Sequence, residues 1–188
     1  GVRVMVLNRA ASYEELYGDF RWDIPYLFNM GVDVCDKNAA RHPDRTGLIV
    51  VEPGKDTVSY TFTDLKRLTN QLANLFIANG LERGDRVGIL MSQSVEVAIS
   101  HVAAWKMAAI SIPLFTLFGE DALRFRLQNS EARILVTDMD NLPKIEAIRE
   151  DLPYLQTILV VGQGADDGSN LDLWSCMAKA ADAFTTVD

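Results

Sequence analysis

Residues 84–137 read GDRVGILMSQSVEVAISHVAAWKMAAISIPLFTLFGEDALRFRLQNSEARILVT, and three short apolar runs lie within them: Val87–Met91, Ile110–Leu114 and Ile134–Thr137. A fourth run, Thr157–Val161, follows, and successive runs begin about 23 to 24 residues apart. This spacing fits one strand, one crossover helix and two short loops. Continuous rather than alternating apolar runs are typical of strands buried on both faces. We therefore expect an α/β fold of three layers, with a mostly parallel sheet and helices on both faces.

Composition narrows the class of protein. The chain has 188 residues, of which 48% are apolar and 23% charged, as is ordinary for a globular protein with one sizeable core. A net charge of −8 argues against a nucleic-acid partner, because phosphate binding needs clustered Lys and Arg. The longest nearly apolar stretch, 95–114, is interrupted by Glu96, His101 and Lys106, so no membrane span is expected.

The two cysteines, Cys35 and Cys176, are far apart and lack CxxC spacing. A disulfide framework or a zinc site is therefore not expected, and a cytoplasmic location is the default prediction. Cys35 shares the inner face of an expected helix, from an Asn29 N-cap to about Arg41, with Val32 and Ala39. We expect it to be a core thiol without a reactive role.

Residues 1–28 are predicted to form an irregular N-terminal arm, and residues 29–188 the α/β subdomain. Ser12 can cap a short helix in the arm, with Glu14 and Glu15 in its first turn. The arm is rich in aromatic residues that we expect to pin it onto the domain surface. These residues are Tyr13, Tyr17, Phe20, Trp22, Tyr26 and Phe28.

An antiparallel hairpin is expected from the runs 48–51 and 57–62, because Pro53-Gly54 stands in the short connection between them. Thr63 is the expected N-cap of the next helix, which Gly80 ends through a left-handed residue. The helix has an apolar stripe that faces the sheet and a polar face expected to lie in solvent. The polar face contains Lys66, Arg67, Asn70, Asn74 and Asn79.

Further helices are expected after each buried strand. Ser94 should cap a largely buried helix, 95–107, in which His101 is interpreted as a hydrogen-bonded core histidine rather than a catalytic one. The next helix begins at Glu120-Asp121 and turns Leu123 and Leu127 inward, another contains Pro143 in its first turn, and residues 171–181 form the last. Residues 162–170 are expected to be a flexible loop.

Catalytic motifs are scarce in this chain. It contains no G-x-x-x-x-G-K-[ST] phosphate loop and no G-x-S-x-G nucleophile elbow, and Gly162-Gln163-Gly164 lacks the third glycine of a dinucleotide fingerprint. Two histidines and two separated cysteines offer little material for a metal cluster. Ligands of open parallel sheets meet the carboxyl ends of the strands, where side chains could wall part of a pocket. The residues at these ends are Ser92, Gln93, Phe115, Thr116, Asp138 and Gly162.

A series of motifs in order resembles the N-terminal part of AMP-forming acyl-CoA synthetases, in particular the medium-chain and acetyl-type branch. The resemblance covers roughly residues 13–162. One departure is Met107-Ala108-Ala109, where the family usually has Gly before Ala. The motifs are Phe20-Arg21-Trp22-Asp23-Ile24-Pro25, Phe28-Asn29, Tyr60-Thr61-Phe62, Gly80, Gly84-Asp85-Arg86-Val87, Glu96, Ala104-Trp105-Lys106, Ile112-Pro113-Leu114-Phe115, Leu117-Phe118-Gly119-Glu120-Asp121-Ala122-Leu123, Asn129-Ser130 and Leu135-Val136-Thr137-Asp138.

The resemblance implies a ligase of fatty or other carboxylic acids that uses ATP and Mg²⁺ to form an acyl-adenylate and passes the acyl group to coenzyme A. Because the chain begins with Gly1, and the family's phosphate loop, adenine motif and C-terminal lysine would lie beyond Asp188, it is expected to be a first subdomain of a protein about three times longer. No catalytic residue is then expected in this part, and none of these cofactors should bind it tightly. By the resemblance, Arg126 lies near the position whose arginine approaches the 3′-phosphate of coenzyme A; a helix-end salt bridge is the alternative role.

Two other classes of function stay open. The chain could be a stand-alone α/β module that binds a small molecule, or an oligomerisation module with an apolar face. If it is a subdomain, the surface that packs against the missing subdomains should be bare, and the isolated chain should then self-associate.

Overall fold

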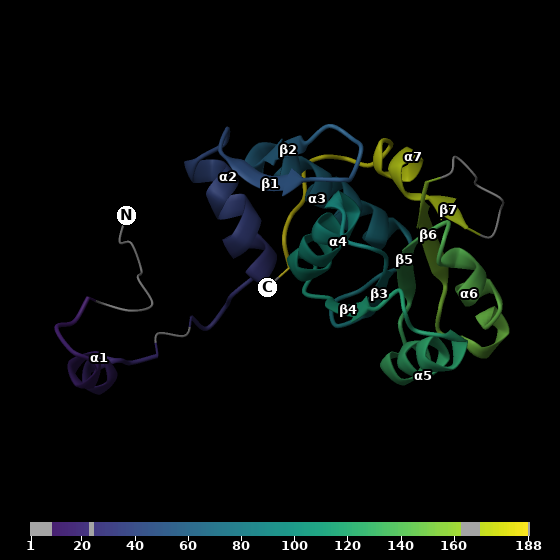
Figure 1. Cartoon of the computed structure of the whole chain (residues 1–188), viewed down its shortest axis with the longest axis horizontal. Helices are drawn as coiled ribbons and strands as arrows, with labels where there is room; N and C mark the ends of the chain where they lie inside the picture. Colours follow the sequence, from purple (N-terminus) through teal and green to yellow (C-terminus); the bar gives the residue numbers. More distant parts are fainter. Residues whose placement is uncertain (1–8, 23–24, 163–169, 188) are drawn as a thin grey trace.

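The computed structural model describes residues 9–22, 25–162 and 170–187. A five-stranded parallel sheet in the order β4-β3-β5-β6-β7 forms the centre of the molecule (Figure 1), which confirms the predicted parallel α/β fold. β4 is an edge strand, and this position tolerates Pro113, which has no N–H to donate to a further strand. The strands are β3 (Arg86–Leu90), β4 (Ile110–Leu114), β5 (Ile134–Asp138), β6 (Thr157–Val161) and β7 (Leu171–Asp172).

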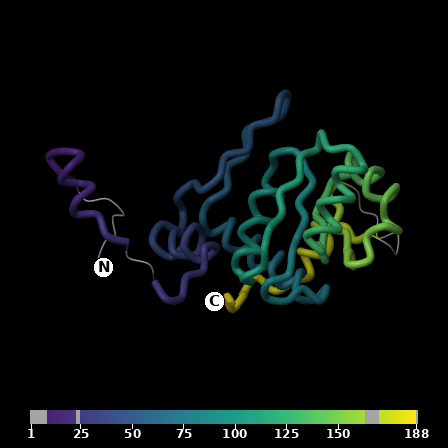
Figure 2. The backbone as a smooth tube through the Cα atoms, turned by 90° about the horizontal axis from the view of Figure 1, so that it is seen from below, coloured from purple at the N-terminus to yellow at the C-terminus, as the bar shows by residue number. Residues whose placement is uncertain are grey.

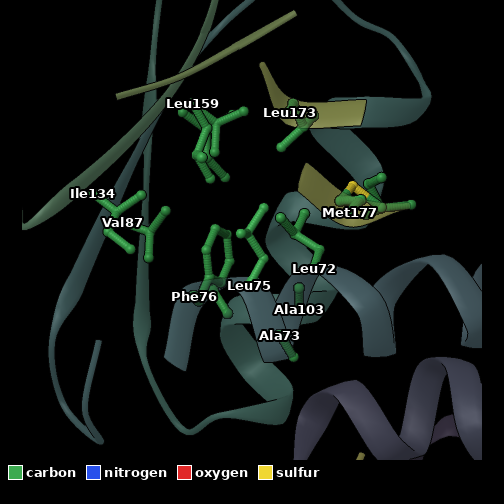
Figure 3. Close-up of a cluster of buried hydrophobic side chains, with 14 of the residues drawn as sticks. Leu72, Ala73, Leu75, Phe76, Val87, Ala103, Ile134, Leu159, Leu173 and Met177 are labelled. Carbon is green, nitrogen blue, oxygen red and sulfur yellow. The ribbon is translucent and has the colours of Figure 1, made fainter. Parts of the chain in front are cut away.

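Two apolar clusters cover the two faces of this sheet. Alternate strand residues separate cleanly: Val87 and Ile89 belong to one cluster, whereas Leu90 belongs to the other. The first cluster is formed with α3 (Phe62–Ala78), α4 (Val95–Lys106) and α7 (Leu173–Met177), and Figure 3 shows its centre around Phe76. The second is formed with α5 (Glu120–Ser130) and α6 (Leu142–Glu146), and with Ile148 and Leu152, which flank the short helix η2 (Arg149–Asp151). The three-layer architecture is therefore as expected.

An antiparallel pair, β1 (Thr46–Val50) and β2 (Val58–Thr61), precedes α3 and confirms the predicted hairpin. The expected N-cap of α3 was wrong by two residues. Thr61, the last residue of β2, accepts a hydrogen bond from the Asp64 N–H, while the Asp64 carboxylate accepts one from the Thr61 N–H. This reciprocal capping box uses the residue at which the strand already has extended backbone, so the helix begins at Phe62 rather than after Thr63.

Three helices end in the same left-handed motif. At the end of α3, the Gly80 N–H donates to Ile77 O and the Leu81 N–H to Phe76 O, with Gly80 at φ +79° as predicted. The same bonds end α4 around Ala108, at φ +54°, and α5 around Glu131, at φ +51°. The departure from the family pattern at Ala108 thus falls at a position that favours glycine.

The helix after Asn29 spans residues 30–41 and contains a π-helical turn, η1 (Val32–Asp36), before α2 (Lys37–Arg41). Asn29 Oδ1 accepts the Val32 N–H at 3.0 Å, so the predicted N-cap is confirmed. Gly31 lies against α4: a Cβ there would be 2.9 Å from Lys106 N and from Val102 O. Only glycine allows this close approach of the two backbones.

The aromatic arm does not pack as expected. Ser12 caps α1 (Tyr13–Asp19) as predicted, but α1 buries none of its residues and lies apart from the sheet (Figures 1 and 2). Tyr13 and Tyr17 stack on each other at 5.9 Å because they are four residues apart on one helix. The aromatic rings thus contact one another instead of pinning the arm, and Tyr26 is fully exposed.

The C-terminal region differs from the prediction in two ways. Residues 171–181 form β7 and the short helix α7 rather than one longer helix. The segment after α7 then runs along α3 (Figure 1), whose polar face was expected to lie in solvent. Asn70 Nδ2 donates to Asp182 O at 2.8 Å, and Asn74 Nδ2 donates to Ala181 O at 2.7 Å. These amides hold backbone groups that form no helix or strand bonds, and Asn70 is buried as a result.

Lys106 is completely buried where this C-terminal segment meets α4 and the helix at 30–41. Its Nζ lies 2.5 Å from Asp36 Oδ1 and donates to Asn70 Oδ1 at 2.7 Å. Its carbonyl accepts from the Val187 N–H at 2.9 Å and from Asn29 Nδ2 at 3.1 Å. One buried ammonium therefore joins three segments that are far apart in sequence.

Candidate crevice at the carboxyl ends of β3 and β4

A crevice of about 370 Å³ opens where β3 and β4 end. The loop after β3, the residues after β4 and two residues of α4, Val97 and His101, contribute to its lining. Ser94 fixes the first loop, because its hydroxyl accepts the Val97 N–H and starts α4 at once. The crevice is lined by Ile89, Met91, Ser92, Gln93, Val97, His101, Pro113, Leu114, Phe115 and Thr116.

Four of the six residues predicted at the strand ends, Ser92, Gln93, Phe115 and Thr116, meet in this crevice. The other two do not line it. Asp138 begins the turn after β5, where its Oδ1 accepts the Asn141 N–H at 2.9 Å. Gly162 takes φ +107° after β6, two strands away from β3. The dinucleotide fingerprint that the sequence argued against falls mainly on 163–169, outside the described residues.

The strand order places the crevice beside the topological switch point rather than on it. The chain moves from β3 to β4 in one direction and from β5 to β7 in the other, so the connections diverge between β3 and β5. The crevice lies on the β4 side of β3. One wall is thus the end of an edge strand, with Phe115 and Leu117 exposed next to it.

His101 is the one polar residue in this lining that the sequence analysis did not place at a site. It is half-buried on α4, and its Nδ1 lies 2.9 Å from Ser111 Oγ on β4, which also accepts the Trp105 Nε1–H at 3.1 Å. Burial lowers the pKa of His101 below its ordinary value, which favours the neutral ring. The predicted hydrogen bonding is present, but the ring is part of the crevice rather than of the core. The spacing of His101 and Trp105, four apart on one helix, was the signal available in the sequence.

Arg126 lies on α5, outside the lining of the crevice. Its guanidinium carbon is 4.1 Å from the centre of the Phe118 ring, and its Nη1 donates to Ala122 O at 3.2 Å. Within the described part of the chain it forms no salt bridge, so the alternative expected for it is not found there. Phe118 in turn packs edge-on against Phe115 of the crevice at 5.4 Å. A row of two aromatic rings thus leads from the crevice to Arg126.

The crevice contains no charged group to perform chemistry. None of its ten lining side chains is acidic, and none carries a permanent positive charge. Across residues 9–22, 25–162 and 170–187, no group of three His, Cys, Asp or Glu side chains could hold a metal ion. Cys35 is buried as predicted, and burial raises the pKa of its thiol, which disfavours a reactive thiolate. The helices of the described regions include none with the length and apolarity to cross a membrane.

Comparison with known proteins gives the family. The family model for AMP-binding enzymes matches residues 35–182. An acetyl-coenzyme A synthetase of Bacillus subtilis (strain 168) is 33% identical over 178 residues, which are 89% of this chain and 31% of that protein. A mitochondrial acyl-coenzyme A synthetase of Mus musculus is 28% identical, over 95% of this chain and 32% of its own length. The chain thus spans about a third of the length of these relatives.

Solved structures agree with the fold. An anthranilate CoA ligase in complex with anthranoyl-AMP superposes with a TM-score of 0.79 and 27% identity, over 88% of this chain and 30% of that one. A fatty acyl CoA synthetase of Mycobacterium tuberculosis gives a TM-score of 0.72 with 26% identity, over 85% and 30%. The resemblance noted in the sequence is therefore confirmed: the chain belongs to the AMP-binding enzyme family and corresponds to the N-terminal part of its acyl-coenzyme A synthetases.

Proposed function

We propose that this chain is the first subdomain of an acid–thiol ligase, an AMP-forming acyl-CoA synthetase. The observation that carries the proposal is the family match over residues 35–182 on a matching fold. In this reaction a carboxylate oxygen attacks the α-phosphorus of ATP, and pyrophosphate leaves. The thiol of coenzyme A, losing its proton, then attacks the acyl carbonyl, and AMP leaves.

The division of labour follows from what the described residues contain. We propose residues 29–188 as the subdomain that contributes the uncharged crevice to one wall of the active site, and residues 1–28 as its arm. The sequence has no phosphate loop, and the described part has no metal cluster, so these residues do not fit Mg²⁺ or the ATP phosphates. We propose that residues following this chain in a longer protein bind both groups. The cytoplasm and fatty-acid metabolism are the proposed setting.

Arg126 is the proposed contact to the 3′-phosphate of coenzyme A. The Phe118 ring holds its guanidinium by a cation–π contact, and the part of the chain that the structure describes offers it no carboxylate within ion-pair distance. A charge held in this way keeps N–H donors for a phosphate. Arg124, two residues away, pairs with Asp121 and Asp151 instead and serves as the matched control.

Thioester formation by the longer protein tests the proposal. A panel of carboxylic acids with ATP, Mg²⁺ and coenzyme A should yield an acyl-CoA and pyrophosphate for at least one acid. Arg126→Ala should raise the KM for coenzyme A about tenfold without changing the KM for the acid, whereas Arg124→Ala should change neither. A protein that makes no thioester from any acid would contradict the proposed activity.

Self-association of the isolated chain is a further part of the proposal. Phe115 and Leu117 are 73% and 95% exposed beside the crevice, and exposed apolar side chains at one edge favour a partner surface. In the longer protein the downstream subdomain would cover them. Light scattering should show concentration-dependent association of this chain that weakens in Leu117→Ser; a monomer at every concentration would contradict it.

A further inference from the structure

His101 has one ring nitrogen that is used inside the protein and one that is not. Nδ1 contacts Ser111 Oγ, whereas Nε2 makes no hydrogen bond to the described residues and is not among their fully buried, unsatisfied polar atoms. Nε2 is therefore reached by solvent. His101 lines the crevice, whereas Ser111, which its Nδ1 contacts, does not, so the side of the ring away from Ser111, with Nε2, is the side turned to the crevice.

The direction of the Ser111 hydrogen bond decides which nitrogen has the proton. Ser111 Oγ accepts from Trp105 Nε1–H, a group that can only donate. The serine hydroxyl has one hydrogen, and His101 Nδ1 is its only acceptor in range among the described side chains. If Ser111 donates to Nδ1, the hydroxyl hydrogen of Ser111 and the indole hydrogen of Trp105 both have acceptors. The neutral ring then has its hydrogen on Nε2, facing the crevice.

The ring is also held in place. Trp105 lies beside it at 5.7 Å between ring centres, one turn along α4, and Ser111 holds it from β4. Two different elements therefore fix the direction of the Nε2–H group. A donor held in this way loses little conformational entropy when a ligand binds.

The residues that line the crevice determine which kind of ligand atom can accept a hydrogen bond from His101. Six of the lining residues are apolar and the polar ones, apart from His101, are Ser92, Gln93 and Thr116. Without a permanent positive charge, a carboxylate or phosphate would lose its hydration without an ionic partner. An uncharged carbonyl oxygen on an otherwise apolar chain matches both the walls and the single donor.

We propose that His101, as the Nε2–H tautomer fixed by Ser111 and Trp105, donates a hydrogen bond to an uncharged carbonyl oxygen of a ligand in this crevice. His101 is then a ligand-binding residue that determines specificity, and Ser111 and Trp105 are positioning residues. This inference rests on the proposed function, because the substrates of that reaction offer two groups with such a carbonyl. These are the amides of the pantetheine arm of coenzyme A and the acyl carbonyl of the acid being activated.

The tautomer is tested on this chain without any ligand. The sequence has only two histidines, and the exposed His42 is an internal reference. Nitrogen-15 NMR of the imidazoles should show His101 protonated on Nε2 alone, and Ser111→Ala should return it to a mixture of tautomers. A His101 protonated on Nδ1, with a lone pair toward the crevice, would overturn the proposal whatever the activity of the protein.

Ligand binding is tested with two uncharged probes at millimolar concentration, pantetheine and hexanamide. At least one should shift the His101 signals and leave those of His42 unchanged; pantetheine points to the coenzyme, hexanamide to the acyl group. His101→Phe should weaken that binding about two- to tenfold, and His101→Gln, which keeps an N–H at a similar place, should restore most of it. Hexanoate should bind less well than hexanamide.

Binding that is unchanged in His101→Phe, or no shift with either probe, would overturn the inference. The proposed function fails in a different experiment, the thioester assay of the longer protein. A correct tautomer and His101-dependent binding of a probe, without thioester formation, would therefore retain this inference and reject the ligase activity.

Discussion

On one face of the sheet, α3, α4 and α7 cover an apolar cluster, and a layer of polar contacts joins them to the helix at 30–41 and to the C-terminal segment. On the other face, α5 and α6 cover a second apolar cluster, and the outer side of α5 is exposed, as at Phe125. The strands β3, β5 and β6 contribute residues to both clusters. The difference is that α4 lies between the sheet and a further layer, so its outer residues are buried as well, and Lys106 among them needs ionic and amide partners.

The largest effect is expected from separating the partners of Lys106. Asp36→Ala would leave a fully buried ammonium without its carboxylate, which should lower the free energy of unfolding by about 3 kcal/mol. Asp33→Ala is the matched control on the same helix. It removes an exposed pair with Lys37 and should cost less than about 0.5 kcal/mol. Urea denaturation measures both, and equal losses would contradict the distinction between the layers.

The close contact at Gly31 gives the next effect. Gly31→Ala would place a methyl group 2.9 Å from two backbone atoms of α4, so the helices must separate, at a cost of about 1–3 kcal/mol. Gly18→Ala is the control, because nothing lies within 4 Å of a Cβ there, and it should increase the helicity of α1. Circular dichroism with urea titration distinguishes them. A Gly31→Ala protein as stable as the parent would show that this layer is loosely packed.

The capping box of α3 gives an effect that depends on pH. Hydrogen bonds from the Thr61 hydroxyl and then the Thr61 N–H lower the pKa of Asp64. A depressed carboxyl pKa adds stability above the pKa of the unfolded state, about 4, and that stability is lost as pH falls through the folded value. Asp64→Ala should thus cost about 1 kcal/mol at pH 7 and progressively less below pH 4. A pH-independent loss would show that the carboxylate charge is not involved.

The smallest effect compares the ends of α4 and α5, one on each face. Ala108→Gly should raise stability by about 0.5–1 kcal/mol, because glycine adopts φ +54° without strain. Glu131→Gly should gain less, since it also removes the ion pair of Glu131 with Arg86 at 3.0 Å. Thermal melts of both variants test the order, and a destabilised Ala108→Gly would contradict the account of this helix end.

The parts of the fold that could be predicted depend on neighbours in sequence. The buried strands are continuous apolar runs, and the cap at Ser94 and the end at Gly80 are local patterns. Thr61 and Thr63 are both good caps, and the choice between them is made by the end of β2, which the sequence places less sharply.

The parts that could not be predicted depend on distant partners. Lys106 looks like a solvent-exposed residue until Asp36, 70 positions away, is brought against it. His101 looks like a core residue until Ser111 on the next strand draws its ring to the crevice wall. The N-terminal arm is the opposite case, because residues expected to be packed are exposed. Its aromatic composition predicts packing but does not identify the surface against which the rings would pack. The spacing of apolar residues predicts which face of a helix or strand is buried, but it does not predict which segment packs against that face.

Isothermal titration of the isolated chain with ATP tests the central claim most directly, which is that these residues form a scaffold and a crevice wall while the nucleotide-binding groups lie outside them. The account predicts little or no heat of binding, because the chain has no phosphate loop and its described residues no metal cluster. Tight, saturable binding of ATP by these 188 residues alone would contradict it.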